Sequence, residues 1–392
     1  MIDLAAVAAT VDVPSSSARQ AAEARQATLT KPAGALGRLE AVAEWWAATS
    51  GTGGAVRQPQ RARMVVFAGD HGVAARTSAY PAAVTAQMVL NMLAGGAGAN
   101  VLAAANGATV RVLDLAVDID WDEAGHLVPD DLTSHKIRRG SDPMDVTDAL
   151  SADEAERAFV AGMRIADEEV DAGADLLIAG DMGIGNTTGA AALIGLLTRH
   201  GAAEVVGRGT GIDDDTWMTK CAVVRDAMFR VTRSVEPSAD PLGLLAGVGG
   251  ADLAAMAGFL LQAAVRGVPV ILDGMVVTSA ALVAASISHR ARLWWLAGHR
   301  SPEPAHTFAL ESMEAEPLVD YGMRLGEGSG ALVALGVLRS AVATLAEMAS
   351  FASAGVSGPV EAEVEVDVEV AQAAPKDAGV DNDGGPADEA RR

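Results

Sequence analysis

The chain has 392 residues, of which 50% are hydrophobic and 4% aromatic, and it contains 42 glycines. This length allows two domains, or one large domain with an appendage, and the scarcity of aromatic residues disfavours an aromatic-lined β-barrel. The formal net charge of −22 repels nucleic acid and anionic membranes, so neither is an expected partner.

A single cysteine, Cys221, makes an intrachain disulfide impossible and fits a reducing compartment. The first residues, Met1–Leu4, lack the basic region of a signal peptide. Two apolar stretches could be mistaken for membrane spans. Leu253–Val265 is too short to span, and Gly267–Ser288 contains Pro269 and an Asp-Gly pair. We therefore expect a soluble, cytoplasmic protein.

The chain divides into a helical start, a mixed middle, a helical end and a tail. Residues 1–60 are expected to be helical, residues 61–300 to form an α/β core, and residues 301–353 to be helices that carry the Glu327 stretch described below. Residues 354–392 are rich in acidic residues and end in a Pro/Gly/Asp run, which predicts a disordered acidic tail.

Short apolar runs in the middle part predict buried strands. They are Met64–Ala68, Thr109–Val117, Asp175–Ala179, Val268–Leu272 and Leu293–Leu296. Helices are predicted between them, including Pro81–Leu93, Ser151–Gly173, Gly189–Arg199, Asp213–Val231 and one helix between Pro241 and Arg266. Ser151 with Glu154 three residues on is the pattern of a capping box.

Four of these strands end in similar polar turns, which begin at Gly69, Gly180, Asp273 and Gly298. Short apolar strands that alternate with helices are typical of a parallel sheet with helices on both faces, an α/β fold. Ligands of such sheets bind beyond the carboxyl ends of the strands, so we expect the site at these turns.

One carboxylate, Glu327, lies among the glycines of Gly326-Glu327-Gly328-Ser329-Gly330. Glycine allows positive φ and a close approach of backbone to ligand. Glu327 is therefore a candidate general base of a group-transfer enzyme. The alternative is an acidic residue in the first turn of a helix, where the helix dipole favours it.

A second motif, Gly183-Ile184-Gly185-Asn186-Thr187-Thr188, follows a strand and opens a helix. Backbone N–H groups at a helix start, together with threonine hydroxyls, suit an anion such as a monophosphate. The motif lacks the Gly-Lys-Ser/Thr ending of a nucleotide-triphosphate loop. A tight strand-to-helix turn is the alternative, and the same two interpretations apply to Gly207–Gly211.

Asp70 and His71 suggest a metal site or an acid–base pair. No second histidine at ligand spacing and no cysteine cluster accompanies them. A strand-end turn that also lines the pocket is the preferred interpretation, and no metal is expected.

At this point the residues resemble a known family, the nicotinate-nucleotide–dimethylbenzimidazole phosphoribosyltransferases of cobalamin synthesis. The matching stretches, in one order over about residues 25–350, are Lys31–Glu40, Phe67–Gly72, Tyr80–Asn91, Gly95–Asn100, Gly180–Thr188, Gly207–Asp213, Leu272–Ser279, Gly298–Ser301 and Arg324–Ala331.

The resemblance implies a Rossmann-like core, a smaller helical domain made from both chain ends, and a homodimer. It implies transfer of the 5-phosphoribosyl group from nicotinate mononucleotide to 5,6-dimethylbenzimidazole, with no cofactor. Glu327 would be the catalytic base. The loop residues Asp181, Gly183, Gly185, Asn186, Thr187 and Thr188 would contact the substrate, as would Lys220, Ser301 and Leu325. Tyr80, Gln87 and Met88 would surround the benzimidazole. Asp70 and His71, in the turn after a strand, are further candidate substrate-binding residues.

One departure is visible. The family's loop commonly reads Gly-Glu-Met-Gly, whereas this chain has Gly180-Asp181-Met182-Gly183. Asp181 is one methylene shorter, so a contact made by the usual glutamate is expected to be longer or to pass through water.

A single base suits the implied reaction. The departing nicotinate is already a pyridinium and leaves as a neutral ring nitrogen, so it needs no general acid, whereas the attacking benzimidazole must lose its other N–H proton. Two other classes of protein remain open: a module that binds the mononucleotide without consuming it, and a metal-dependent phosphate-ester hydrolase that uses Asp70, His71 and Asp181.

Overall fold

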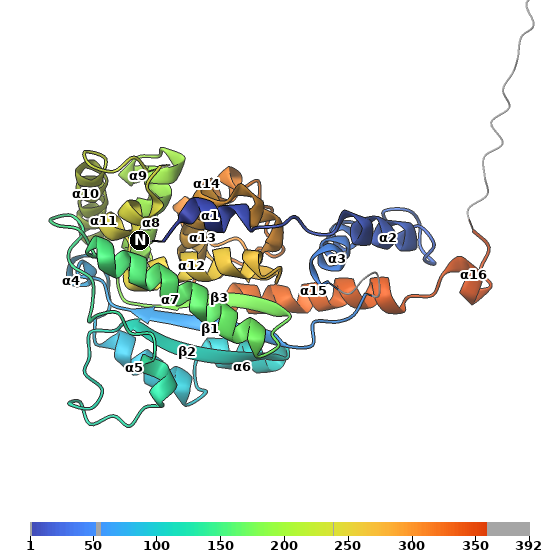
Figure 1. The fold of residues 1–392 in the computed structure, drawn as a ribbon, viewed down its shortest axis with the longest axis horizontal. Coiled ribbons are helices and arrows are strands. Elements are labelled where there is room, and N and C mark those ends of the chain that lie inside the picture. The colour runs from blue at the N-terminus through green and yellow to red at the C-terminus, as the bar shows by residue number, and fades with distance from the viewer. Residues whose placement is uncertain (1, 52–55, 238, 359–392) are drawn as a thin grey trace, which may run out of the picture. The chain divides into compact units, whose positions relative to one another are not determined.

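The computed structural model describes residues 2–51, 56–237 and 239–358, and Figure 1 shows the fold. Five parallel strands form one sheet in the order β2-β1-β3-β4-β5. The strands are β1 (Ala62–Gly69), β2 (Ala108–Ala116), β3 (Leu176–Met182), β4 (Val270–Leu272) and β5 (Trp295–Ala297). The predicted α/β fold with a parallel sheet is confirmed. The chain runs outward from β1 in both directions, which places a crevice at the carboxyl ends of β1 and β3.

Helices connect the strands and flank the sheet. The α-helices are α1 (Leu4–Ala9), α2 (Ser16–Gln26), α3 (Arg38–Thr49), α4 (Ala74–Thr77), α5 (Val84–Leu93), α6 (Gly98–Ala105), α7 (Ala152–Asp171), α8 (Asn186–Thr198), α9 (Ala202–Val205), α10 (Asp214–Val231), α11 (Pro241–Val248), α12 (Ala251–Val265), α13 (Met275–Ile287), α14 (Pro304–Ser312), α15 (Ser329–Glu347) and α16 (Phe351–Ala354). Two 3₁₀ turns are η1 (Asp130–Thr133) and η2 (His289–Trp294).

Alternation along the strands gives the sheet two buried faces. Val65 and Phe67 of β1 point to a core built with α7, α8 and α10 to α13, whereas Met64 and Val66 point to a core built with α3, α5, α6 and α15. Figure 1 shows α7 and α12 on one side of the sheet and α5 and α6 on the other. Both faces are covered, as a parallel sheet requires.

The closest helix pair on the first face is α7 with α12, and two glycines make the approach possible. A Cβ at Gly162 of α7 would lie 1.8 Å from the carbonyl oxygen of Ala255, and a Cβ at Gly258 of α12 would lie 1.9 Å from that of Phe159. The contact is therefore backbone to backbone, and neither helix tolerates a side chain at these positions.

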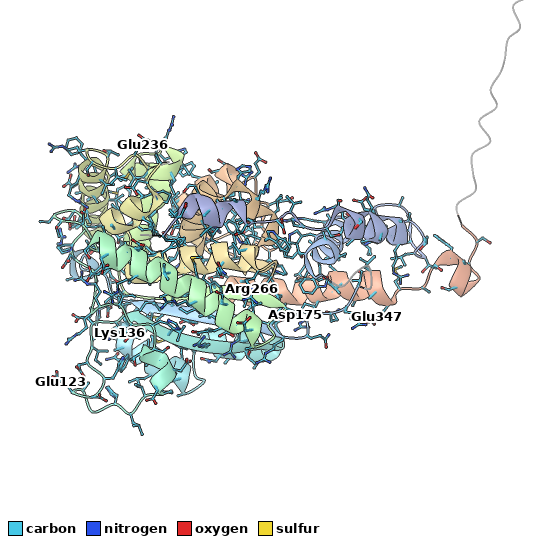
Figure 2. All side chains as sticks on the ribbon, in the orientation of Figure 1. Glu123, Lys136, Asp175, Glu236, Arg266 and Glu347 are labelled. Atoms are coloured by element: carbon cyan, nitrogen blue, oxygen red, sulfur yellow. The ribbon has the colours of Figure 1, made fainter. Side chains whose placement is uncertain are left out.

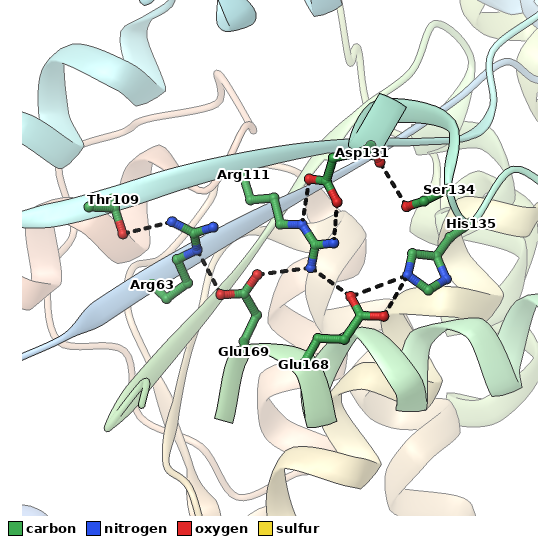
Figure 3. Close-up of polar contacts among 8 residues, drawn as sticks. All are labelled: Arg63, Thr109, Arg111, Asp131, Ser134, His135, Glu168 and Glu169. Atoms are coloured by element: carbon green, nitrogen blue, oxygen red, sulfur yellow. Dashed lines mark hydrogen bonds and ion pairs between the residues drawn. The ribbon is translucent and has the colours of Figure 1, made fainter. Parts of the chain in front are cut away.

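The outer end of α7 is tied to the edge strand by charged groups (Figure 3). Arg111 of β2 donates two hydrogen bonds to Asp131 of η1, at 2.6 and 2.9 Å, and also reaches Glu168 and Glu169 of α7. These partners raise the pKa of the Arg111 guanidinium. The arrangement fixes η1, and so the middle of the long segment between β2 and α7, against the sheet.

Further charged contacts fasten surface segments to the core (Figure 2). Arg266, just after α12, pairs with Asp167 at 2.8 Å and Asp171 at 2.7 Å, both on α7. Lys136 donates to the fully buried carboxylate of Asp114 at 2.8 Å. Such side-chain contacts help to fasten the largely irregular segment 118–150 to the sheet.

The helices near the two chain ends pack together. α2, α3 and α15 contact one another. Arg25 at the end of α2 donates to the carbonyl oxygens of Leu345, Ala346 and Met348, a cation placed at the C-terminal end of α15. The described residues up to Val356 form a single unit. The division at residues 60, 300 and 353 into core and smaller domain stays a prediction, and the predicted acidic tail lies outside the described residues from position 359 onward.

Some predicted elements differ from the structure, and the clearest cases are a divided helix and a shortened strand. The expected helix between Pro241 and Arg266 is two helices, α11 and α12, separated at Gly249 and Gly250. The last strand begins at Trp295, because His289–Trp294 forms a 3₁₀ turn. The capping box of α7 is present: Ser151 N–H donates to Glu154 at 2.9 Å, and Glu154 N–H donates to the Ser151 hydroxyl at 3.2 Å.

By length and composition alone, Val84–Ala105 and Ser329–Glu347 could cross a membrane. In the structure, the first stretch is broken between α5 and α6, and the second, α15, packs against α3, α6 and the sheet.

Candidate active site

A cavity of about 490 Å³ opens at the carboxyl ends of β3, β4 and β5. Its polar wall consists of Asp181, Asn186, Thr187, Asp273, His299, Ser301, Glu303 and Glu327. Its apolar wall consists of Tyr80, Val84, Met88, Met182, Ile184, Met275, Val276 and Leu325, and Arg324 and Thr210 lie at its edge. A cavity of this size with an apolar wall and a few convergent polar groups is typical of a small-molecule site.

Glu327 does not belong to a helix. α15 begins two residues later, at Ser329, and Gly328 precedes its first residue. Gly326, Glu327 and Gly328 all have positive φ, of 79°, 63° and 84°. A left-handed conformation at a residue with a side chain costs on the order of 1–3 kcal/mol. The alternative interpretation, an acidic residue in the first turn of α15, is therefore wrong.

The sheet leaves room for this turn only because of two glycines. A Cβ at Gly180 of β3 would lie 2.7 Å from the carbonyl oxygen of Glu327. A Cβ at Gly328 would lie 2.5 Å from the sulfur of Met64. The Glu327 turn thus rests directly on the backbone of β3, which holds its side chain over the cavity.

The carboxylate of Glu327 is 5% exposed and accepts a hydrogen bond of 3.2 Å from Ala99 N–H, in the first turn of α6. Burial raises the pKa of Glu327, the Ala99 bond opposes that rise, and the charge of Asp273 adds to it. A raised pKa makes a carboxylate a stronger base, which suits proton abstraction near neutral pH.

Asp181 ends β3 beside this turn. It is 6% exposed, and its Oδ2 accepts a hydrogen bond of 2.6 Å from the Asn186 side chain. Burial, together with the charges of Asp273, Asp252 and Glu327, raises the pKa of Asp181 to about 8. Asp181 is therefore largely protonated at neutral pH and presents a neutral carboxylic acid to the cavity.

This pKa predicts a pH-dependent stability. The folded protein keeps a proton on Asp181, whereas the unfolded chain loses that proton above about pH 4. The free energy of unfolding therefore falls as the pH rises from about 4 to about 8. The slope reaches roughly 1.4 kcal/mol per pH unit. Asp181→Asn removes this titrating group. The difference in melting temperature, variant minus unmodified protein, should therefore be larger near pH 8 than near pH 5. Exposed Glu123→Gln is the control, with a curve parallel to the unmodified protein; a parallel curve for Asp181→Asn would contradict the prediction.

Asp273, one residue beyond β4, lies beneath the start of α15. Its carboxylate accepts hydrogen bonds from Gly328 N–H at 3.2 Å and from Ala331 N–H at 3.0 Å. His299 Nε2 lies 3.5 Å from the same carboxylate. Burial raises the pKa of Asp273, and His299 opposes that rise.

The predicted phosphate loop also lies at the cavity, where the Asn186 side chain donates to Asp181. α8 begins at Asn186, three residues earlier than expected, so Asn186, Thr187 and Thr188 form its first turn. Gly183, Asn186 and Thr187 line the cavity, whereas Gly185 and Thr188 lie behind them. Gly185 has a φ of 98° and packs on His71 and Ala74.

Lys220 of α10 lies behind Thr187. Its ammonium donates to the Thr187 hydroxyl at 2.8 Å, and the side chain is almost wholly buried. Burial lowers the pKa of Lys220 to about 8, while nearby Glu303 opposes that shift. Ser301 lines the cavity as predicted. Lys220 thus lies directly behind Thr187 of the cavity wall.

Glu303 holds the neighbouring loop. Its Oε1 accepts a hydrogen bond of 2.9 Å from Gly209 N–H, and a Cβ at Gly207 would lie 2.0 Å from its Oε2. Arg324 donates to the Gly209 carbonyl at 2.9 Å from the opposite side. The loop 207–211 therefore forms part of the cavity edge and is fixed from two directions.

Only some of the residues expected around a ring substrate line the cavity. Tyr80 and Met88 line the apolar wall, as does Leu325, whose side chain is 57% exposed. Gln87 is exposed on the outer side of α5 and does not line the cavity. Helix geometry places adjacent residues 87 and 88 on different faces, which explains the split.

Asp70 and His71 lie behind the cavity wall rather than in it, unlike the expectation. Asp70 accepts a hydrogen bond of 2.5 Å from Thr85, whose hydroxyl in turn accepts one of 3.0 Å from Ile184 N–H. His71 Nε2 lies 3.0 Å from Asp252. Burial lowers the pKa of His71, but the hydrogen bond and charge of Asp252, together with the charges of Asp70 and Asp181, make the net shift upward. Both residues support the Gly183–Asn186 turn from behind.

Within residues 2–51, 56–237 and 239–358, no group of three or more histidine, cysteine or acidic side chains is arranged to hold a metal ion.

Several cavity residues were not assigned from the sequence: Asp273, His299, Glu303, Arg324, Met182, Met275 and Val276. Asp273 and His299 had a detectable signal, because each follows a strand. Arg324 directly precedes Leu325 in the Arg324–Ala331 stretch, whereas Glu303 contacts the distant loop 207–211, which no local pattern indicates.

Comparison with known proteins agrees with this geometry. A family model described as phosphoribosyltransferase matches residues 11–356. The chain belongs to this phosphoribosyltransferase family.

Relatives in the family cover nearly the whole chain. A nicotinate-nucleotide–dimethylbenzimidazole phosphoribosyltransferase from Mycolicibacterium paratuberculosis is 59% identical over 353 residues, which are 90% of this chain and 98% of that protein. A protein of the same name from Mycobacterium marinum is 57% identical over 350 residues, 89% of this chain and 95% of that protein. Among solved structures, CobT from Thermus thermophilus superposes with a TM-score of 0.80 and 42% identity, over 87% of this chain and 99% of its own.

Proposed function

We propose that the cavity beside Glu327 transfers the 5-phosphoribosyl group of nicotinate mononucleotide to 5,6-dimethylbenzimidazole. The products are α-ribazole 5′-phosphate and nicotinate, which places the reaction in assembly of the cobalamin nucleotide loop. The observation that carries the proposal is a buried carboxylate, Glu327, held in a left-handed turn at the carboxyl ends of the strands. Relatives that share 57–59% identity bear the name of this activity.

The donor binds with its phosphate at the start of α8. Thr187 and Asn186 supply polar groups there, backbone N–H groups and the helix dipole favour an anion, and Lys220 adds a cation behind Thr187. These local donors are needed because the chain as a whole is strongly acidic. Ser301 lies on the same side of the cavity lining and is positioned to contact the ribose or phosphate.

The acceptor base binds against the apolar wall, with Met88, Val276 and Leu325 around its ring. One of its nitrogens attacks C1′ as the C1′–N bond to nicotinate breaks, and the electron pair of that bond neutralises the pyridinium nitrogen. The proton on the other acceptor nitrogen passes to Glu327. The step therefore balances with one carboxylate base and no acid at the leaving group.

The first test is product analysis. Purified protein is incubated with nicotinate mononucleotide, with and without 5,6-dimethylbenzimidazole, and with and without EDTA. We expect nicotinate and a ribosylated benzimidazole phosphate only when the base is present, at the same rate in EDTA. Nicotinate release without the base would instead indicate a hydrolase, loss of activity in EDTA would indicate a metal-dependent enzyme, and unconsumed but bound mononucleotide would indicate a sensing module.

We also propose that the protein is a cytoplasmic homodimer without a membrane or nucleic-acid partner. Support comes from the family resemblance, the acidic surface and two large apolar side chains at the cavity edge, Tyr80 and Leu325, that are more than half exposed. Light scattering coupled to size-exclusion chromatography measures the subunit number directly.

A further inference from the structure

Asp273 contacts the backbone that carries Glu327. Gly328 N–H, which donates to Asp273 Oδ2 at 3.2 Å, belongs to the peptide group whose carbonyl is that of Glu327. On its other side, this peptide group rests against Gly180, where no Cβ could be accommodated. The orientation of the peptide plane, and with it the direction of the Glu327 side chain, is therefore set between a strand backbone and one carboxylate.

The same carboxylate also holds the first turn of α15, because its Oδ1 accepts Ala331 N–H at 3.0 Å. Asp273 is fully buried and spans the junction between a strained turn and a helix N-terminus. Only an ionised carboxylate offers an acceptor on both oxygens; an amide of the same shape offers one acceptor and one donor.

His299 supports Asp273 from behind. Its Nε2 lies 3.5 Å from Asp273 Oδ1, and its ring occupies space left by two glycines. A Cβ at Gly330 would lie 2.0 Å from the ring, and a Cβ at Gly274 would lie 3.1 Å from Nε2. The ring is wedged between the turn after β4 and the start of α15, so the carboxylate cannot swing away from the Glu327 turn.

We infer that Asp273, supported by His299, is a positioning residue of this phosphoribosyltransferase: its two backbone hydrogen bonds hold the left-handed Glu327 turn in the orientation that presents the base to the acceptor. The inference rests on the proposed role of Glu327. It assigns a task to Asp273 and His299, two polar residues that line the cavity.

The test is Asp273→Asn, which keeps the shape but removes one acceptor and the charge. We expect kcat to fall by roughly 10–100-fold, a share of the ~10²–10⁴-fold that a positioned base supplies. The KM for the mononucleotide should change by less than about 3-fold. The groups facing Glu327 are Asp181, Asp273, His299 and Ala99 N–H. Because the Asp273 charge raises the pKa of Glu327, its loss should move the acidic limb of the kcat profile to lower pH.

Asp114→Asn is the matched control. Asp114 is also fully buried on a strand and accepts a backbone N–H, from Val117 at 2.7 Å, but it lies on β2, away from the cavity lining. It should lower thermal stability while leaving the pH profile of kcat in place. A merely structural role for Asp273 would give the same pattern as this control, and that result would overturn the inference.

A double-mutant cycle separates this inference from the proposed function. If Asp273 acts through Glu327, adding Asp273→Asn to Glu327→Gln should cause little further loss of kcat. Full additivity overturns the inference while leaving the base in place, whereas an active Glu327→Gln variant overturns the proposed function. If Asp273→Asn does not fold, His299→Gln takes its place in the same cycle. We expect His299→Gln to lower kcat by less than Asp273→Asn, and to cause little further loss of kcat in the Glu327→Gln background.

Discussion

Replacing Glu327 with glutamine is expected to lower kcat by about 10²–10⁴-fold, the usual contribution of a positioned general base. Glutamine has nearly the same shape and can still accept the hydrogen bond of Ala99 N–H, but it cannot take a proton from the acceptor ring. Affinity for nicotinate mononucleotide should be preserved, because the substitution leaves Asn186, Thr187 and Lys220 of the proposed phosphate site unchanged. Steady-state kinetics and calorimetric titration with the mononucleotide measure the two effects separately.

Glu314→Gln is the control for this variant. Glu314 is another of the described glutamates with positive φ, 54°, but it is exposed and does not line the cavity. Its replacement should leave kcat unchanged, which shows that the loss at position 327 reflects the proton rather than the unusual backbone. Unimpaired turnover in Glu327→Gln would remove Glu327 from the mechanism.

The largest expected loss of stability comes from Gly162→Ala. The added Cβ would lie 1.8 Å from the carbonyl oxygen of Ala255, a backbone atom in the middle of α12 that cannot rotate away. α7 and α12 must move apart, and the core beneath both helices loses contacts with Phe67 and Phe259. We expect the free energy of unfolding to fall by about 3 kcal/mol or more.

Gly336→Ala is the matched control, since it also changes a glycine inside a helix. The nearest atom to its Cβ is Oδ1 of Asn106, at 2.8 Å, the movable end of a side chain. A gain in helix propensity offsets the small displacement, and we expect a change within about 1 kcal/mol. Urea denaturation of both variants decides the matter; equal stabilities would show that the α7–α12 contact adapts to a side chain.

Local patterns in the sequence predicted most of the sheet. Each strand is a short apolar run that stops at glycine or aspartate, and this signal depends only on neighbouring residues. The position of the site followed, because parallel strands bring their carboxyl ends to one edge. The break between α11 and α12 escaped prediction, because Gly249 and Gly250 lie inside a long apolar run that alone reads as one helix.

The side chains of the site were predictable only where a motif carried them. Glu327 and Thr187 lie in glycine-rich turns and line the cavity as expected. Glu303 reaches it through contacts with residues almost one hundred positions earlier, which no local pattern records. Asp70 and His71 were expected in the cavity but face inward, because Asp70 accepts a hydrogen bond from Thr85 and His71 pairs with Asp252.

The glycine frame around Glu327 has a consequence for engineering the enzyme's substrate range. Positions 180, 326, 328 and 330 are closed to any side chain by positive φ or by contact with the Glu327 backbone, Asp181, Met64 or His299. Random mutagenesis across this turn would therefore yield mostly inactive clones. The apolar wall differs, because Val84, Met88, Met275 and Val276 line the cavity with side chains and none of them has positive φ. A library confined to these four positions should change which acceptor ring the enzyme uses. The carboxylate that activates the acceptor, Glu327, would stay the same.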